Sequence, residues 1–354
     1  MRFGLLFILL FFPSEVLRAE TQIYSKIESL FYTPSQPFRQ FESDWSAPYL
    51  KANRAIQYNW WELGFKYKNW SASIFHQEYG AIRYAPDSGE FYWLTENNKP
   101  LQIDRVYEVD IDVSYVEMQG FRLAHQFALS KSVKSEFGFS ILKGSSLLSG
   151  SLKGNIIPLA EDDYEFDDIG IDYYYSNDFL FEREVSEPVG EGISVDWNLY
   201  WQRSRKTNIT FEARNLYGYI KWRDTPYTVA KVSSDNKEYD ENGYVIVHAT
   251  LQGQHHSKNY YQRLPAIIKL RSVLQISDQW SVLFELFHTD LVSFPIFGAT
   301  RFIGSSSMVE FFYTPNVDAI GLRFKNSKFA IHLSSDNLIL NRSRYLSIGF
   351  QLSI

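Results

Sequence analysis

Residues 106–118 read VYEVDIDVSYVEM. Every second side chain from Tyr107 to Tyr115 is aliphatic or aromatic, and the side chains between them are acidic or small and polar. Successive side chains of an extended strand point to opposite faces, so this period of two predicts a β-strand with one apolar and one polar face. The stretch decides the fold class because the same pattern recurs along the chain.

The alternation returns at 192–202, again from Trp280, and over the last ten residues, 345–354. In the first of these segments Trp197 and Leu199 share the apolar face. Helical spacing appears nowhere with comparable strength. We therefore predict an all-β chain.

The connections between alternating runs fall into two kinds. Short polar junctions are expected at 68–69, 130–132, 203–208, 277–279 and 326–328, and long irregular polar stretches at 32–53, 143–191, 223–243 and 334–344. Tight turns at one end and long loops at the other are typical of transmembrane β-barrels. The pattern predicts a single antiparallel up-and-down barrel with long extracellular loops.

Parity gives the number of strands, because junctions that lie at the same end enclose even numbers of strands. The predicted strands are 22–31, 54–67, 70–84, 89–95, 101–117, 119–130, 133–142, 192–203, 207–217, 264–276, 280–289, 319–324, 328–334 and 345–354. This assignment predicts about 14 strands. The parity rule allows 12 to 18, with extra pairs in 143–191, 218–252 or 290–317.

The first residues have the composition of a secretory signal peptide. Arg2 precedes the apolar run at 3–12, and the small residue Ala19 suits a cleavage site. A membrane-anchoring helix is the alternative, but it would need about 20 apolar residues. We predict a signal peptide at 1–19 and a barrel at 20–354.

The composition excludes several classes of protein. The chain has 354 residues, no cysteine and a net charge of -6. Disulfide frameworks and thiolate metal sites are therefore excluded, and an acidic chain is a poor general binder of nucleic acid. A hydrophobic content of 45% with 17% aromatic residues excludes a disordered chain.

The final strand runs to Ile354 with apolar side chains at every second position, including Phe350. This ending resembles the signal by which bacterial outer-membrane barrels are recognised for assembly, although that class usually ends in an aromatic residue. The resemblance implies a Gram-negative outer membrane, with membrane lipid and the barrel-assembly machinery as partners. A secreted soluble β-protein, with its apolar face inside, remains the alternative.

If the apolar face is outside, the polar face lines a lumen. The expected lining residues carry both signs: Glu108, Asp110, Asp112, Arg122, Lys134, Glu136, Asp196, Glu212, Arg214, Lys269, Arg271 and Glu285. With acids near 110 and bases near 270, one hypothesis is a transverse field across a water-filled pore. The other is a network of paired charges that fills and stiffens the barrel.

These features predict a porin-like channel or export protein for polar solutes or polymers. A non-conducting binding or scaffold barrel, using its long loops on a polar small molecule or polysaccharide, is the first alternative. An outer-membrane hydrolase is the second. No catalytic motif stands out, the acidic stretch 160–168 lacks calcium-loop spacing, and we assign no catalytic residue, metal or cofactor.

Overall fold

The computed structural model describes residues 21–204, 206–239, 245–304 and 306–354. The predicted signal peptide at 1–19 lies outside the described residues. Within the described ranges, no helix is long and apolar enough to cross a membrane.

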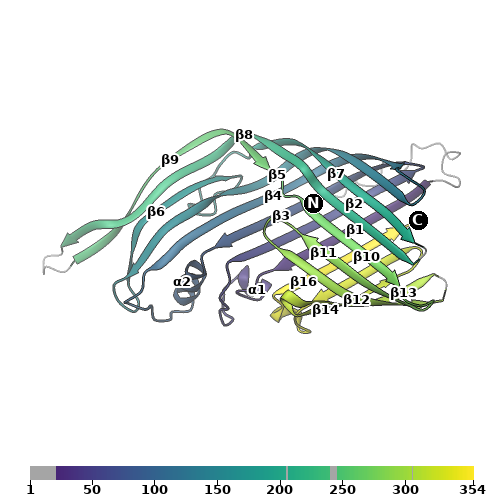
Figure 1. Cartoon of the computed structure of the whole chain (residues 1–354). Coiled ribbons are helices and arrows are strands. Elements are labelled where there is room, and N and C mark those ends of the chain that lie inside the picture. The colour runs from purple at the N-terminus through teal and green to yellow at the C-terminus, as the bar shows by residue number, and fades with distance from the viewer. Residues whose placement is uncertain (1–20, 205, 240–244, 305) are drawn as a thin grey trace.

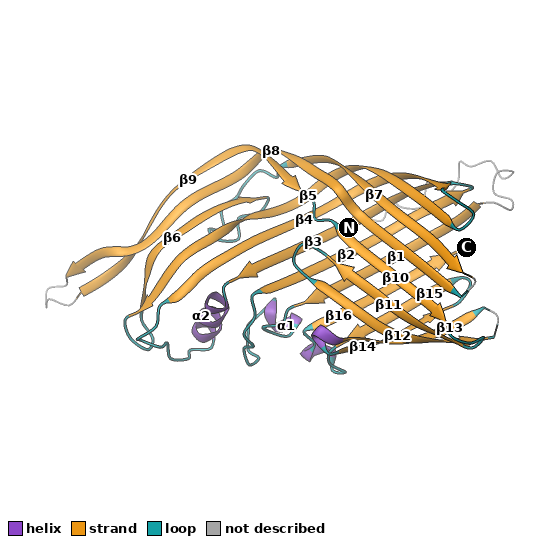
Figure 2. Cartoon of the chain, in the orientation of Figure 1, coloured by secondary structure: helices purple, strands orange, loops and turns teal. Residues whose placement is uncertain are grey.

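The described chain is almost entirely β-structure (Figure 2). Its strands are β1 (Thr21–Tyr32), β2 (Arg54–Tyr67), β3 (Trp70–Tyr84), β4 (Tyr107–Ala128), β5 (Val133–Pro158), β6 (Tyr164–Tyr175), β7 (Val189–Ser204), β8 (Thr207–Tyr239), β9 (Val245–Arg263), β10 (Ile267–Gln275), β11 (Trp280–His288), β12 (Ser293–Ile303), β13 (Ser307–Thr314), β14 (Ala319–Lys325), β15 (Phe329–Ser335) and β16 (Tyr345–Ser353). Two short α-helices, α1 (Phe38–Phe41) and α2 (Pro86–Glu96), lie in the connections β1–β2 and β3–β4.

Fourteen of these sixteen strands close into one antiparallel ring in chain order, with β6 and β9 left outside it. Residues 133–144 of β5 pair directly with β7, and residues 207–214 of β8 pair with β10. The ring closes where β16 pairs with β1. The backbone amide and carbonyl groups of Ile23 and Ile354 complete the seam, each N–H donating to the other carbonyl at 2.9 Å. The predicted all-β, 14-strand up-and-down barrel is confirmed.

Beyond the ring, the sheet continues on one side as an extension that we call the hood. It consists of β6, β9 and the outer parts of β4 (107–116), β5 (147–158) and β8 (219–239). The short turns and the C-terminus lie at the opposite end of the barrel (Figure 1), and so does Thr21, which pairs with Tyr67 beside the β2–β3 turn. We call these the hood end and the short-turn end.

The strand count is right although several assigned strands are wrong. Residues 89–95 form part of helix α2, because Pro86 at the first helical position and Asp87 in the first turn favour a helix there. The predicted strands 101–117 and 119–130 are one continuous strand, β4. Two strands absent from the assignment, β12 and β13, lie in 290–317, where parity allowed an extra pair.

The stretches 143–191 and 223–243 are not irregular loops as predicted. In the described residues they contain the outer part of β5, all of β6 and the outer part of β8, which pair with one another in the hood. Interstrand hydrogen bonds there satisfy backbone groups that a polar loop would leave to water. Only 176–188 in the first stretch is a long connection without strand structure.

Large apolar side chains cover the outside of the ring. On β4, Phe121 and Leu123 are about half exposed, whereas Arg122 between them is buried. The same holds on β14, where Ile320 and Leu322 point outward and Arg323 inward. The apolar face of the strands therefore lies outside the barrel, as predicted.

The hood end departs from this pattern. Tyr107 and Val109, predicted to face lipid, are buried against Leu101 and the α2 residues Phe91 and Leu94. The outward face of the hood strands is apolar as well, but helix α2 and the connection before β7 cover it. This part of the apolar face is a second protein core.

Candidate functional site

Side-chain contacts between strands that are not neighbours define the interior of the barrel. Glu28 on β1 accepts hydrogen bonds from Arg214 on β8 at 2.9 Å and from Lys269 on β10 at 2.5 Å. Since β1 pairs only with β16 and β2 among the described strands, these contacts must cross the inside of the ring. Lys26 of β1 adds ion pairs to Glu28 at 3.2 Å and to Glu212 at 3.8 Å.

A second group of charges is centred on Arg122, which is 7% exposed. Its guanidinium donates to Asp196 at 2.8 Å and to Glu136 at 3.0 Å. Arg122 reaches across β5 because residue 138 is glycine: a Cβ there would lie 2.6 Å from the guanidinium. Both carboxylates accept further hydrogen bonds. Glu136 accepts from the side-chain amide of Asn198, and Asp196 accepts from the backbone N–H of Asn215.

The third group joins two arginines to two glutamates. Arg323 donates to Glu285 and to Glu310 at 2.6 Å each, and Arg271 contacts the same two carboxylates. Glu310 is 1% exposed, so its charge depends on these partners. We call the three groups together the charged layer.

A cavity of about 400 Å³ lies within the charged layer. Its lining includes Lys26, Glu28, Lys269, Arg271, Glu285 and Arg323, and it also touches Phe287 and Phe312. Charged groups of both signs therefore surround space large enough for a small solute.

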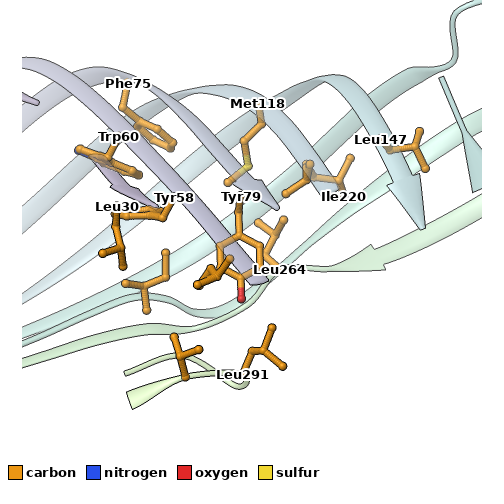
Figure 3. Close-up of a cluster of buried hydrophobic side chains, with 14 of the residues drawn as sticks. Leu30, Tyr58, Trp60, Phe75, Tyr79, Met118, Leu147, Ile220, Leu264 and Leu291 are labelled. Atoms are coloured by element: carbon orange, nitrogen blue, oxygen red, sulfur yellow. The ribbon is translucent and has the colours of Figure 1, made fainter. Parts of the chain in front are cut away.

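Towards the hood end the interior changes to an apolar layer (Figure 3). It is built by Leu30, Ile56, Tyr58, Trp60, Phe75, Tyr79, Val116, Met118, Leu142, Leu147, Ile220, Trp222, Leu264, Ile267, Leu291, Val292, Phe294, Ala319 and Tyr345. On β4, Met118 lies nearer the hood than Arg122, and on β8 Ile220 lies nearer the hood than Arg214. The apolar layer thus covers the charged layer from the hood side.

One turn contributes to this layer from within the barrel mouth. The β11–β12 turn buries Leu291 and Val292, and Asp290 accepts a hydrogen bond from Tyr79 of β3 at 3.0 Å. The Leu291 carbonyl accepts a second from Arg54 of β2 at 2.9 Å. Strands β2 and β3 lie across the ring from β11, so the turn spans the lumen.

Trp222 packs the hood side of the apolar layer against two glycines. A Cβ at Gly144 would lie 2.4 Å from its ring and one at Gly190 2.7 Å. The indole is fully buried and donates to Gln262 at 3.0 Å. Only glycine at these positions lets the indole pack this closely against the wall.

The structure distributes the expected lumen residues over three places. Arg122, Glu136, Asp196, Glu212, Arg214, Lys269, Arg271 and Glu285 belong to the charged layer. Glu108, Asp110 and Asp112 lie in the hood, where Lys153 pairs with Asp110 at 3.0 Å and with Asp112 at 3.5 Å, while Lys134 is exposed near the short-turn end.

The expected transverse field is not seen among the described residues. The acids near 110 and the bases near 270 lie at different depths. Lys269 and Arg271 each hold their own carboxylate partners, Glu28 for the first and Glu285 and Glu310 for the second. The charges are interleaved, because adjacent opposite charges offset the desolvation cost of burial.

Sequence reasoning missed Glu28, Glu310 and Arg323 as interior charges. The period of two within 22–31 and 319–324 could have identified Glu28 and Arg323. Glu310 lies on β13, which the sequence assignment did not include.

A closed ring with an apolar outer face and a charged interior defines the class: the chain is an outer-membrane β-barrel. No family model matches it, and no curated protein matches its sequence.

Solved structures with a similar fold include the following three. A TodX deltaS2S3 mutant monoaromatic hydrocarbon channel has a TM-score of 0.45 and 10% identity, over 94% of this chain and 89% of that one. A FadL homologue of Pseudomonas aeruginosa has a TM-score of 0.40 and 10% identity, over 96% and 90%. The Ralstonia pickettii toluene transporter TbuX has a TM-score of 0.35 and 9% identity, over 96% and 90%.

Proposed function

We propose that this chain is a gated transport barrel that passes small polar solutes across the outer membrane. The observation that carries the proposal is the cavity of about 400 Å³ in the charged layer, covered on the hood side by the apolar layer. A cavity lined by charges does not stabilise a closed barrel, because burying charges has a cost in desolvation free energy. Lining groups of both signs suit a solute with charged or hydrogen-bonding groups.

The β11–β12 turn is the part of the apolar layer best suited to move. It is a short connection and not a wall strand, and two polar contacts, to Tyr79 and Arg54, tie it to the far side of the ring. Displacing Leu291 and Val292 would open the apolar layer without breaking a strand pair.

Conductance and uptake test this function. We expect the unchanged protein to conduct weakly in planar bilayers and the double variant L291G/V292G to conduct strongly and to admit a small sugar into vesicles. The matched control is Leu338→Gly, at a fully exposed loop position. If the folded L291G/V292G variant passes neither ions nor sugar, the transport role is refuted. If it passes only a small aromatic hydrocarbon, the transported substrate is hydrophobic and not polar.

A non-conducting binding barrel is the second candidate, and the hood favours it. Tyr174 stacks on Tyr260 with ring centroids 4.1 Å apart, and its ring centroid lies 4.4 Å from that of Tyr227. The Lys258 ammonium lies 3.5 Å from the centroid of the Tyr227 ring. Aromatic platforms with polar neighbours suit sugar units of a polysaccharide. In this case a hood deletion would abolish ligand binding, and the gate variant would remain closed.

We place the protein in the outer membrane of a Gram-negative bacterium, after removal of 1–19 as a signal peptide. The apolar outer face supports contact with membrane lipid. Recognition of the last strand by the assembly machinery is part of the same proposal. Cell fractionation tests the location, and a soluble periplasmic protein would contradict it.

A further inference from the structure

Three potential metal ligands meet on the outer wall of the barrel. One ligand atom each of His76, Glu78 and Glu117 lies within 4.8 Å of the others. The Nε2 atom of His76 is 3.3 Å from Oε1 of Glu78 and 3.9 Å from Oε1 of Glu117. The first two residues come from β3 and the third from β4.

The pattern of burial places this cluster on the outward face. Gln77 and Tyr79 are buried, and so is Met118, while His76, Glu78 and Glu117 alternate with them and are partly exposed. Ile74 and Phe121, both exposed, lie on the short-turn side of the cluster. The cluster therefore marks the hood-side margin of the apolar belt.

The two carboxylates repel each other in this position. Glu78 and Glu117 are direct partners in the β3–β4 register, and like charges placed directly opposite destabilise a sheet. Among the described residues, the only basic group within ion-pair distance of either is His76. Next to hydrocarbon, an ionisable cluster of this kind is costly unless a ligand neutralises it.

Neighbouring amides orient one of the carboxylates. Asn59 Nδ2 donates to Oε2 of Glu78 at 2.8 Å, and Gln57 Nε2 lies 3.4 Å from the same oxygen. These contacts leave Oε1 of Glu78 directed at His76 and Glu117. Hydrogen bonds that fix a ligating carboxylate are the usual outer shell of a metal site.

We propose that His76, Glu78 and Glu117 form a divalent metal site of the zinc type on the membrane-facing wall. One imidazole nitrogen and two carboxylate oxygens are ligands that Zn²⁺ accepts, and three protein ligands leave a position open to an outside oxygen. Ligand atoms of a tetrahedral zinc ion lie roughly 3.4 Å apart, so small side-chain rotations complete the site. The metal neutralises the repulsion between the two carboxylates.

Zinc titration of the folded, untagged full chain in detergent micelles tests the site. With a chromophoric chelator as competitor, we expect one Zn²⁺ per chain, and at least tenfold weaker binding in His76→Asn and in Glu117→Gln. The control His288→Asn changes another partly exposed histidine, one that contacts Ser293, and should bind as the unchanged protein does.

Heat-modified electrophoretic migration verifies that each variant is folded, and thermal unfolding provides a second readout. Zinc should raise the unfolding temperature of the unchanged protein and of His288→Asn only, because a ligand stabilises the state that it binds. Zinc binding that persists in the folded double variant H76N/E117Q, or no binding by the unchanged protein at micromolar zinc, would overturn the proposal. Binding of Mg²⁺ alone, unaffected by His76→Asn, would overturn the zinc assignment.

Discussion

Arg122 shows how single residues hold the interior together. Its side chain compensates two carboxylates that come from β5 and β7, and all three groups are less than a tenth exposed. Losing one member of such a group costs more than the pair itself contributes, since charges without partners remain buried.

We predict that Arg122→Met destabilises the folded barrel by about 3–5 kcal/mol, because Glu136 and Asp196 lose their cation. Urea unfolding in lipid vesicles, followed by tryptophan fluorescence, measures the change. Lys153→Met is the control: it removes a half-exposed partner of Asp110 and should cost less than about 1 kcal/mol. Equal effects of the two substitutions would contradict a dry, strongly coupled Arg122 group.

Asp178 fastens the connection 176–188 to the hood. Burial opposes its charge, but hydrogen bonds from Tyr173, Arg183 and the backbone N–H of Phe181 outweigh this and lower the pKa of the carboxyl. A lowered pKa means that the ionised group stabilises the docked connection above the ordinary carboxyl range.

The docked connection should therefore be protected at neutral pH and lose protection as the pH falls through the lowered pKa of Asp178. Hydrogen exchange of 176–188, corrected for intrinsic rates, measures this. In Asp178→Asn the protection should be weak at every pH. A pH profile that is the same with and without Asp178 would show that another group controls the docking.

At the scale of elements, alternation was the most reliable guide. It located β2 and β3 to the residue, because each buries one face and leaves the other partly exposed over most of its length. It failed at 89–95, where aromatic residues typical of strands belong to helix α2, and it could not find the β11–β12 turn as a lumen element. The turn's position depends on Tyr79 and Arg54, which are far away in sequence.

The outer β8–β9 part of the hood, residues 226–257, should be separable from the barrel. Every pair in the closed ring can form without residues 226–257, and Trp222 still pairs with Tyr260 when they are removed. We predict that a variant with 226–257 replaced by a short turn folds and keeps its heat-modified migration. A variant lacking 345–354 serves as the contrast, since it removes a wall strand, and should not fold. If the variant without 226–257 also fails to fold, this part of the hood belongs to the folding unit.

At the scale of the whole molecule, the interior has two layers of opposite character. Alternation predicted charges on the inward face of the strands, and the structure places Arg122, Asp196 and Lys269 in the charged layer. The apolar layer could not be predicted from single strands. Tyr58, Met118 and Ile220 lie on the inward face of their strands, which is otherwise polar and becomes apolar only towards the hood end. The layer becomes visible when the strands are placed side by side.

We predict that the unboiled protein migrates as a compact species in detergent gels and shifts on boiling, since a closed ring has no free edge at which unfolding can begin. It should sediment with membranes and resist extraction by high salt. Gel electrophoresis of membrane fractions with and without heating checks both statements. A protein that leaves the pellet with salt, or migrates identically after heating, would be a soluble sandwich.

The seam between β1 and β16 joins the two ends of the described chain. Tyr24 is matched with Ser353, so the two edges that must meet are separated by almost the full length of the described chain. Pairing of such distant segments is slow, because loop-closure entropy opposes it before the contacts form. Until the nine-residue strand β16 pairs with β1, one edge of β1 is unpaired and can bind another extended chain. That edge therefore needs protection until the ring closes.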